Sequence, residues 1–324
     1  SLGANTTGEK NTAVGTFALD SNTTGSHNTA LGYEALTSNT QGDSNVSVGW
    51  KSLELNTTGD SNVALGRDAL GENTTASNNT AIGHNTLNGN TTGTSNTAVG
   101  ANALDANTTA SNNTAVGKAA LGANTTGTGN VAVGVNVLDA NTTADNNTAV
   151  GTGAASSNTT GAEINAFGTN ALFANTTGLA NCAFGNSSLD ANTTGGLNIA
   201  MGIQSLSSNT TASDNTAIGT FSMRDNTTGA GNVAVGRSAL LFNTTASNNT
   251  AIGTYALYVN TTGANNTSIG ANALDANTTG QSNVAVGNGA LGSNTTASNN
   301  TAVGKNALIL NTTGTENIAI GAAA

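Results

Sequence analysis

Apolar and polar residues follow one pattern along this chain, and the pattern returns every 17 residues. It is N-T-A-V-G-x-x-A-L-x-x-N-T-T-G-x-x, counted so that Asn11 is position 1 and Gly15 is position 5. Nineteen copies of the position 5 glycine follow one another from Gly15 to Gly321 without an insertion or a deletion. Strict spacing is typical of units stacked directly on one another, and 17 residues are too few for a helical pair. The repeat therefore predicts an all-β fold, a parallel β-solenoid or β-roll of 19 coils. We expect residues 1–324 to form a single uninterrupted array with no capping repeat and no separate domain.

The pattern also predicts how each coil is built. Positions 1–4 and 6–9 favour two short strands separated by a bend at the position 5 glycine, and N-T-T favours a third short extended piece. Position 4 is always apolar, as in Val14, Ile82 and Met201, and position 9 is leucine in nearly every copy. We therefore expect the side chains at positions 4 and 9 to form the core.

Two glycine columns mark the corners of the predicted coil. Position 5 is glycine in every copy, which indicates a positive φ or a close backbone neighbour. Position 15 is glycine or alanine, and in the six alanine copies position 17 is Asn or Asp. Because Asn and Asp tolerate the left-handed region, we expect the strained residue to move from position 15 to position 17 in those six copies. The first structural glycines of the position 5 column are Gly15, Gly32, Gly49, Gly66, Gly83 and Gly100.

Asparagine recurs at positions 1 and 12, and stacked carboxamides can bond from one coil to the next. The position 12 residue also opens an N-x-[ST] sequon in every copy except Asn39, which is followed by Thr40 and Gln41. The column is therefore interpreted either as a hydrogen-bonded ladder or as a set of acceptors for covalent glycans along one edge. Its sequon members are Asn5, Asn22, Asn56, Asn73, Asn90, Asn107, Asn124, Asn141, Asn158, Asn175, Asn192, Asn209, Asn226, Asn243, Asn260, Asn277, Asn294 and Asn311.

Small residues at two further positions bear on the number of chains. Position 3 is always Ala or Ser, and position 8 is nearly as restricted, although strand alternation places them opposite the predicted core. Strands covered on both faces would explain this restriction, so we expect a homotrimer or a bundled fibre. The alternative is a thin solitary solenoid whose narrow interior requires small side chains.

Composition excludes several classes of function. The net charge is −10 with only 7 Lys and Arg, so neither a nucleic acid nor an anionic membrane is an expected partner. No apolar run is long enough to span a membrane. His27 and His84 occupy different repeat positions, Cys182 is the single cysteine, and aspartates at position 10 never occur in adjacent coils. We therefore expect no enzyme, no cofactor, no metal site and no calcium ladder.

The phrase N-T-A-V-G-x-x-A-L resembles the head repeats of trimeric autotransporter adhesins. The longer form A-L-x-x-N-T-T-G-x-x-N-T-A-V-G is similar to repeat arrays in phage tail-fibre and bacterial surface proteins. The resemblance covers the whole chain, and it implies a left-handed, trimeric β-roll outside the cell, at a cell surface or on a virion. We expect a structural component of an extracellular fibre or filament, which can polymerise end to end. The alternative is a binding module with a repetitive face, either an ice-binding face or a glycan-coated fibril.

Overall fold

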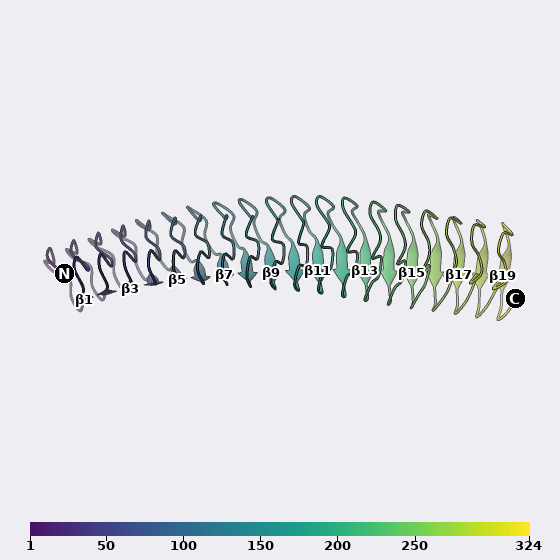
Figure 1. Ribbon diagram of the computed structural model, residues 1–324, viewed down its shortest axis with the longest axis horizontal. Helices are drawn as coiled ribbons and strands as arrows, with labels where there is room; N and C mark the ends of the chain where they lie inside the picture. The colour runs from purple at the N-terminus through teal and green to yellow at the C-terminus, as the bar shows by residue number, and fades with distance from the viewer. The chain divides into compact units, whose positions relative to one another are not determined.

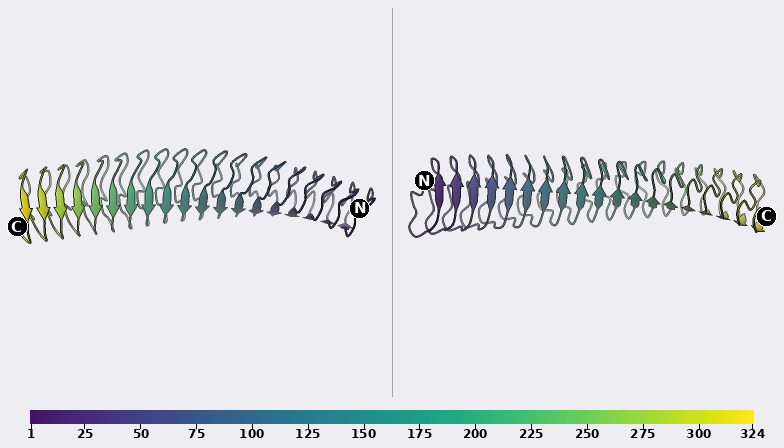
Figure 2. Two further views of the ribbon diagram at one scale, coloured as in Figure 1. Left: turned by 180° about the vertical axis from the view of Figure 1, so that it is seen from behind. Right: turned by 90° about the horizontal axis from the view of Figure 1, so that it is seen from below.

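The computed structural model describes residues 1–324 and contains strands but no helix. The chain divides into two compact units, residues 1–163 and residues 164–324, called here the N-terminal and the C-terminal unit. Each unit is a parallel β-solenoid in which one 17-residue repeat makes one coil with one strand of three residues. Within each unit the strands form one row along the same side of the coils (Figure 1 and Figure 2).

The strands of the N-terminal unit are β1 (Thr12–Val14), β2 (Thr29–Leu31), β3 (Val46–Val48), β4 (Val63–Leu65), β5 (Thr80–Ile82), β6 (Thr97–Val99), β7 (Thr114–Val116), β8 (Val131–Val133) and β9 (Thr148–Val150). Those of the C-terminal unit are β10 (Asn165–Phe167), β11 (Cys182–Phe184), β12 (Ile199–Met201), β13 (Thr216–Ile218), β14 (Val233–Val235), β15 (Thr250–Ile252), β16 (Thr267–Ile269), β17 (Val284–Val286), β18 (Thr301–Val303) and β19 (Ile318–Ile320).

The register within each unit follows the repeat. In the N-terminal unit, Ala13 of β1 lies beside Ala30 of β2, and every later pair of strands is aligned in the same way. Backbone hydrogen bonds between coils continue outside the strands, for example from the Leu19 N–H to the Ala35 carbonyl at 3.0 Å. The prediction that equivalent residues stack as hydrogen-bonded rungs is therefore confirmed within each unit.

The prediction of two or three strands per coil is wrong. Only positions 2–4 form a strand, and positions 6–11 form a turn. Left-handed residues produce this turn: in one coil, Asn102 at position 7 has φ 58° and Leu104 at position 9 has φ 52°. A left-handed leucine costs about 1–2 kcal/mol, which the backbone bonds to neighbouring coils must offset. Leucine carries no sequence signal for this conformation, so the pattern did not reveal the turn.

The two versions of the second corner also differ from expectation. Position 17 has a positive φ whether position 15 is alanine or glycine: φ is 63° at Asn78 in the Ala76 coil and 58° at Ser95 in the Gly93 coil. The position 15 glycines are not left-handed, so the strained residue does not move between versions. Position 15 is instead held by its carbonyl, since the Ala76 oxygen accepts hydrogen bonds from two asparagine side chains, Asn62 at 2.9 Å and Asn73 at 3.0 Å.

The core lies on the other side of the strand from the side predicted. Position 3 points inward, so that Ala30 and Ala64 are fully buried, whereas position 4 points outward. Position 9 is buried as predicted, with Leu104 fully enclosed. Position 3 faces position 8 across the interior, because the Ser47 hydroxyl contacts the Ser52 carbonyl oxygen at 2.8 Å. The interior is too narrow for a branched side chain at position 3, so the narrow-interior alternative explains the small residues at positions 3 and 8.

Candidate assembly surface

The first and third residues of every strand, at positions 2 and 4, form the outward surface that we call the strand face. Successive side chains on a strand point to opposite sides, so burial of the position 3 alanine turns both neighbours outward. In the N-terminal unit Leu31 is 47% exposed and Ile82 is 37% exposed. In the C-terminal unit Met201 is 41% exposed and Ile252 is 39% exposed. The most consistently apolar column of the repeat is therefore on the outside.

The strand face carries no charge. All Lys, Arg, Asp and Glu residues of the chain lie at positions 6, 7, 10, 11, 16 and 17. Position 2 holds Thr, Val or Ile in every copy except Asn165 and Cys182. In the C-terminal unit, Phe167 of β10 and Phe184 of β11 stack face to face with ring centroids 4.6 Å apart. Because no ion has to lose its hydration shell, this face can be covered at low electrostatic cost.

The exposed area gives the scale of the gain from covering the strand face. Full burial of a Val, Leu or Ile side chain contributes about 1.5–3 kcal/mol, so covering the two-fifths that is exposed at Leu31 or Ile82 contributes about 0.6–1.2 kcal/mol. The other exposed position 4 side chain of the N-terminal unit is Val14, and the remaining six of the column are half-buried and contribute less. Association costs about 4–15 kcal/mol in lost freedom of motion. Covering position 4 therefore offsets part of that cost, and the gain grows with the number of coils.

The position 5 glycines place the strand face by turning the chain directly after position 4. Their φ values are 131° at Gly15, 139° at Gly32, 137° at Gly49, 136° at Gly66, 139° at Gly83 and 127° at Gly100. A Cβ added at Gly49 would lie 2.5 Å from the Gly66 carbonyl oxygen of the next coil. Both reasons given for this column, a positive φ and a close backbone neighbour, are therefore confirmed.

The two asparagine columns lie inside the coils and form the predicted ladders. Asn107, at position 12, donates from Nδ2 to the Asn90 side-chain oxygen at 2.8 Å and to the Ala110 carbonyl at 3.1 Å. At position 1, the Asn113 N–H donates to the Asn96 side-chain oxygen at 3.0 Å. The position 12 asparagines are fully buried, apart from Asn5, which is exposed, and Asn311, which is partly exposed. Within each unit the ladders connect neighbouring coils through buried hydrogen bonds.

This placement bears on the expected glycan acceptors. Both amide hydrogens of Asn107 are used in hydrogen bonds, and its side chain has no exposed area. A glycan on that nitrogen would replace one of the two hydrogens and would have no room inside the coil. We therefore expect the buried position 12 asparagines of the folded coils to remain unmodified, and the intact mass of the purified chain tests this expectation.

The titratable groups are spread over separate coils. Burial raises the pKa of the Asp105, Asp190 and Asp275 carboxyl groups above their ordinary value of 3.8. Cys182 lies at position 2 on the strand face, where burial raises the pKa of its thiol. No three His, Cys, Asp or Glu side chains come together in a way that could hold a metal ion. The structure also contains no helix that is long and apolar enough to cross a membrane.

No protein-family model matches this chain, and no curated protein is significantly similar to it. The fold therefore defines the class, which is that of tandem-repeat parallel β-solenoids with buried asparagine ladders. The resemblance to fibre and adhesin repeats rests on the 17-residue pattern alone.

Proposed function

We propose that this chain is a structural segment of an extracellular fibre, at a cell surface or on a virion, and that copies of it associate side by side through the strand face. The observation that carries the proposal is the uncharged, apolar column at position 4, which stays large and apolar in every copy although it points outward. Within its own chain this column is only partly covered. Contact with a second copy of the chain would bury the position 4 column, which would explain why the column is apolar in every copy.

A second copy is favoured as the partner because its surface has the same period. One copy presents an apolar side chain in every coil, about 4.8 Å apart, and an identical copy presents the matching row. The contributions of successive coils add, whereas the cost of association is met once. This arrangement suits a fibre, in which strength grows with length. The repeat resemblance supports the extracellular setting.

Lysines on the strand face test the proposal. In the variant Val99→Lys, Val116→Lys and Val133→Lys, three neighbouring position 4 residues of the N-terminal unit become charged. A lysine there reaches water in a single chain, but between two strand faces it would be desolvated without a partner, at a cost of several kcal/mol. We expect size-exclusion chromatography with light scattering to show oligomers for the unsubstituted chain and folded monomers for this variant.

The matched control places the same three charges at another position of the repeat, in the same stretch of the N-terminal unit. Ala101→Lys, Val135→Lys and Thr152→Lys all lie at position 6, where Lys118 and Lys305 occur naturally. This control should keep the mass of the unsubstituted oligomer. Equal masses for both lysine variants would mean that the strand face is not the interface.

The strand face also favours a second candidate, ice binding. Ice binding by a β-solenoid calls for threonines at alternate positions of a flat strand, and the N-T-T triplet does not provide this arrangement. The strand does place Thr outward at position 2 in ten of the copies, as in Thr80, Thr97 and Thr114, beside the apolar position 4. Thermal hysteresis of the unsubstituted chain that is lost in the Val99→Lys, Val116→Lys and Val133→Lys variant would identify this activity, and absence of hysteresis in the unsubstituted chain would eliminate it.

A further inference from the structure

One coil of the C-terminal unit lacks side chains at two positions of its turn. Gly289 at position 7 and Gly292 at position 10 make this the single copy of the repeat with glycine at both positions. Because neither glycine has a side chain, a hollow of about 330 Å³ lies between the coils on either side. The hollow is lined, besides the two glycines, by Asn272, Asp275, Asn288, Ser293, Asn306 and Ile309.

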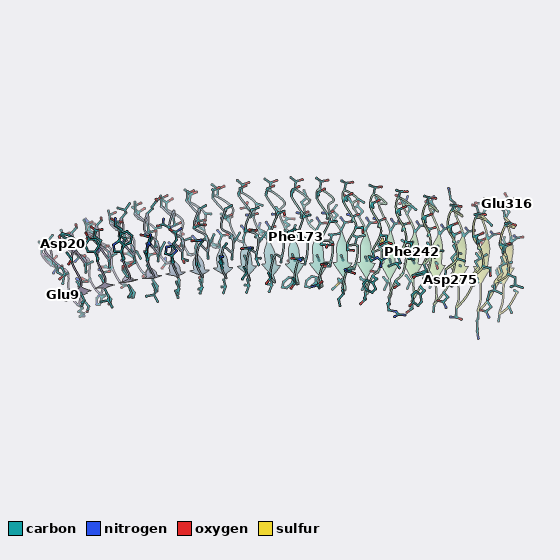
Figure 3. The ribbon with its side chains drawn as sticks, in the orientation of Figure 1. Glu9, Asp20, Phe173, Phe242, Asp275 and Glu316 are labelled. Atoms are coloured by element: carbon teal, nitrogen blue, oxygen red, sulfur yellow. The ribbon has the colours of Figure 1, made fainter.

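Side chains of the neighbouring coils point into the space that the glycines leave. A Cβ added at Gly292 would lie 3.5 Å from Oδ1 of Asp275, in the preceding coil, and 3.7 Å from Cγ1 of Ile309, in the following coil. A Cβ added at Gly289 would lie 2.6 Å from Oδ1 of Asn306. The hollow therefore has a carboxylate on one side, and a carboxamide oxygen and an aliphatic side chain on the other. Asp275 is labelled in Figure 3.

The lining has the chemistry that a sugar ring requires. The carboxylate can accept hydrogen bonds from neighbouring hydroxyl groups, each carboxamide can both accept and donate them, and Ser293 adds a hydroxyl. Ile309 supplies an apolar wall for the C–H groups of the ring. The volume lies at the lower end of the range of small-molecule sites, about 300–1,000 Å³, which suits one ring. Partial burial raises the pKa of Asp275, and the same desolvation strengthens hydrogen bonds to its oxygens.

We infer that this hollow binds a single pyranose unit of a neutral carbohydrate, with Asp275, Asn272 and Asn306 contacting its hydroxyl groups. One carboxylate among neutral amides suits an uncharged polyol better than a calcium ion, whose sites usually combine several carboxylates. The site lies on the turn of the coil, apart from the strand face, so it does not depend on the proposed assembly.

The hollow can be filled with residues that the repeat already carries at these positions. Gly289→Asn with Gly292→Asp copies Asn272 and Asp275 from the preceding coil. Asn272 has φ 54° and Gly289 has φ 65°, so asparagine fits the backbone. The matched control is Gly153→Asn, the same change at position 7 of the N-terminal unit.

Saturation-transfer NMR with the methyl glycosides of glucose, galactose, mannose and N-acetylglucosamine tests the inference. We expect at least one glycoside to bind saturably to the full chain, with a loss of affinity of about tenfold or more in the filled variant, because the added side chains occupy the space of the ring. The control should bind as the unsubstituted chain does. Failure of all four glycosides to bind, or equal binding by the filled variant, would overturn the inference. So would calcium binding at Asp275 without sugar binding, which would identify a cation site.

Discussion

Removing one asparagine from the inner ladder should destabilise the solenoid strongly. In Asn107→Ala the Asn90 side-chain oxygen loses its donor, and the Asn124 side chain loses an acceptor at 3.2 Å. The Ala110 carbonyl keeps a second donor, Asn96 at 2.8 Å. The buried Asn90 oxygen is thus left without a donor at about 1–3 kcal/mol, and the Asn124 amide keeps only its hydrogen bond to the Gly127 carbonyl, so the free energy of unfolding should fall by about 2–4 kcal/mol.

Urea unfolding followed by far-UV circular dichroism measures this loss. Thr109→Ala is the control, because Thr109 lies two residues away in the same coil and its side chain is exposed. The control should change the free energy of unfolding by less than about 0.5 kcal/mol. If Asn107→Ala cost no more than Thr109→Ala, the ladder would contribute little to stability and this reasoning would be refuted.

Three further changes test the geometry of the coil. Gly100→Ala should destabilise the chain by more than about 3 kcal/mol in urea unfolding, because φ is 127° and the new Cβ would lie 2.6 Å from the Gly117 carbonyl oxygen; tolerance of alanine would contradict the close approach. Leu104→Ala should lower the free energy of unfolding by about 2–5 kcal/mol and Val99→Ala by under about 1 kcal/mol, since only Leu104 is fully buried. A larger loss in Val99→Ala would show that position 4 lies in the core, and would contradict the structure. Burial raises the folded-state pKa of Asp105 above 3.8, so its protonated form stabilises the fold at low pH, and this stability is lost as pH rises through the folded pKa. Urea midpoints from about pH 3 to about pH 7 should decline less with rising pH in Asp105→Asn than in the unsubstituted chain, and equal slopes would contradict the raised pKa.

The period, the glycine corner and the asparagine ladders could be predicted from sequence because each depends on repetition. Asn107 and its equivalents recur at one spacing, and stacking of equivalent residues follows from that spacing. Gly100 and its equivalents have no replacement in any copy, which indicates a backbone requirement. These features need no knowledge of the width of the coil.

The direction of the strand could not be predicted in the same way. Alternation states that positions 3 and 4 face opposite sides, but it does not state which side is inside. The larger apolar residue is usually the one that lies in a core. Here the narrow interior holds Ala98, which is fully buried, and Val99 points outward. The exposed apolar column then becomes the candidate assembly surface.

The hollow in the C-terminal unit could not be predicted from the sequence, although the two glycines that produce it are present there. Gly289 and Gly292 read as two more glycines in a glycine-rich chain. Only the stacking of Asp275 and Ile309 in the neighbouring coils shows that the two missing side chains share one space. Columns of a repeat therefore identify what every coil needs, and departures from the columns identify sites.

Sedimentation equilibrium of the unsubstituted chain tests the proposed assembly most directly. The strand face predicts a mass of two or more times 31.4 kDa at micromolar concentrations, with retained β-sheet circular dichroism. A folded species that stays at 31.4 kDa up to the highest concentration reached would show that the apolar face tolerates water, and would contradict the account.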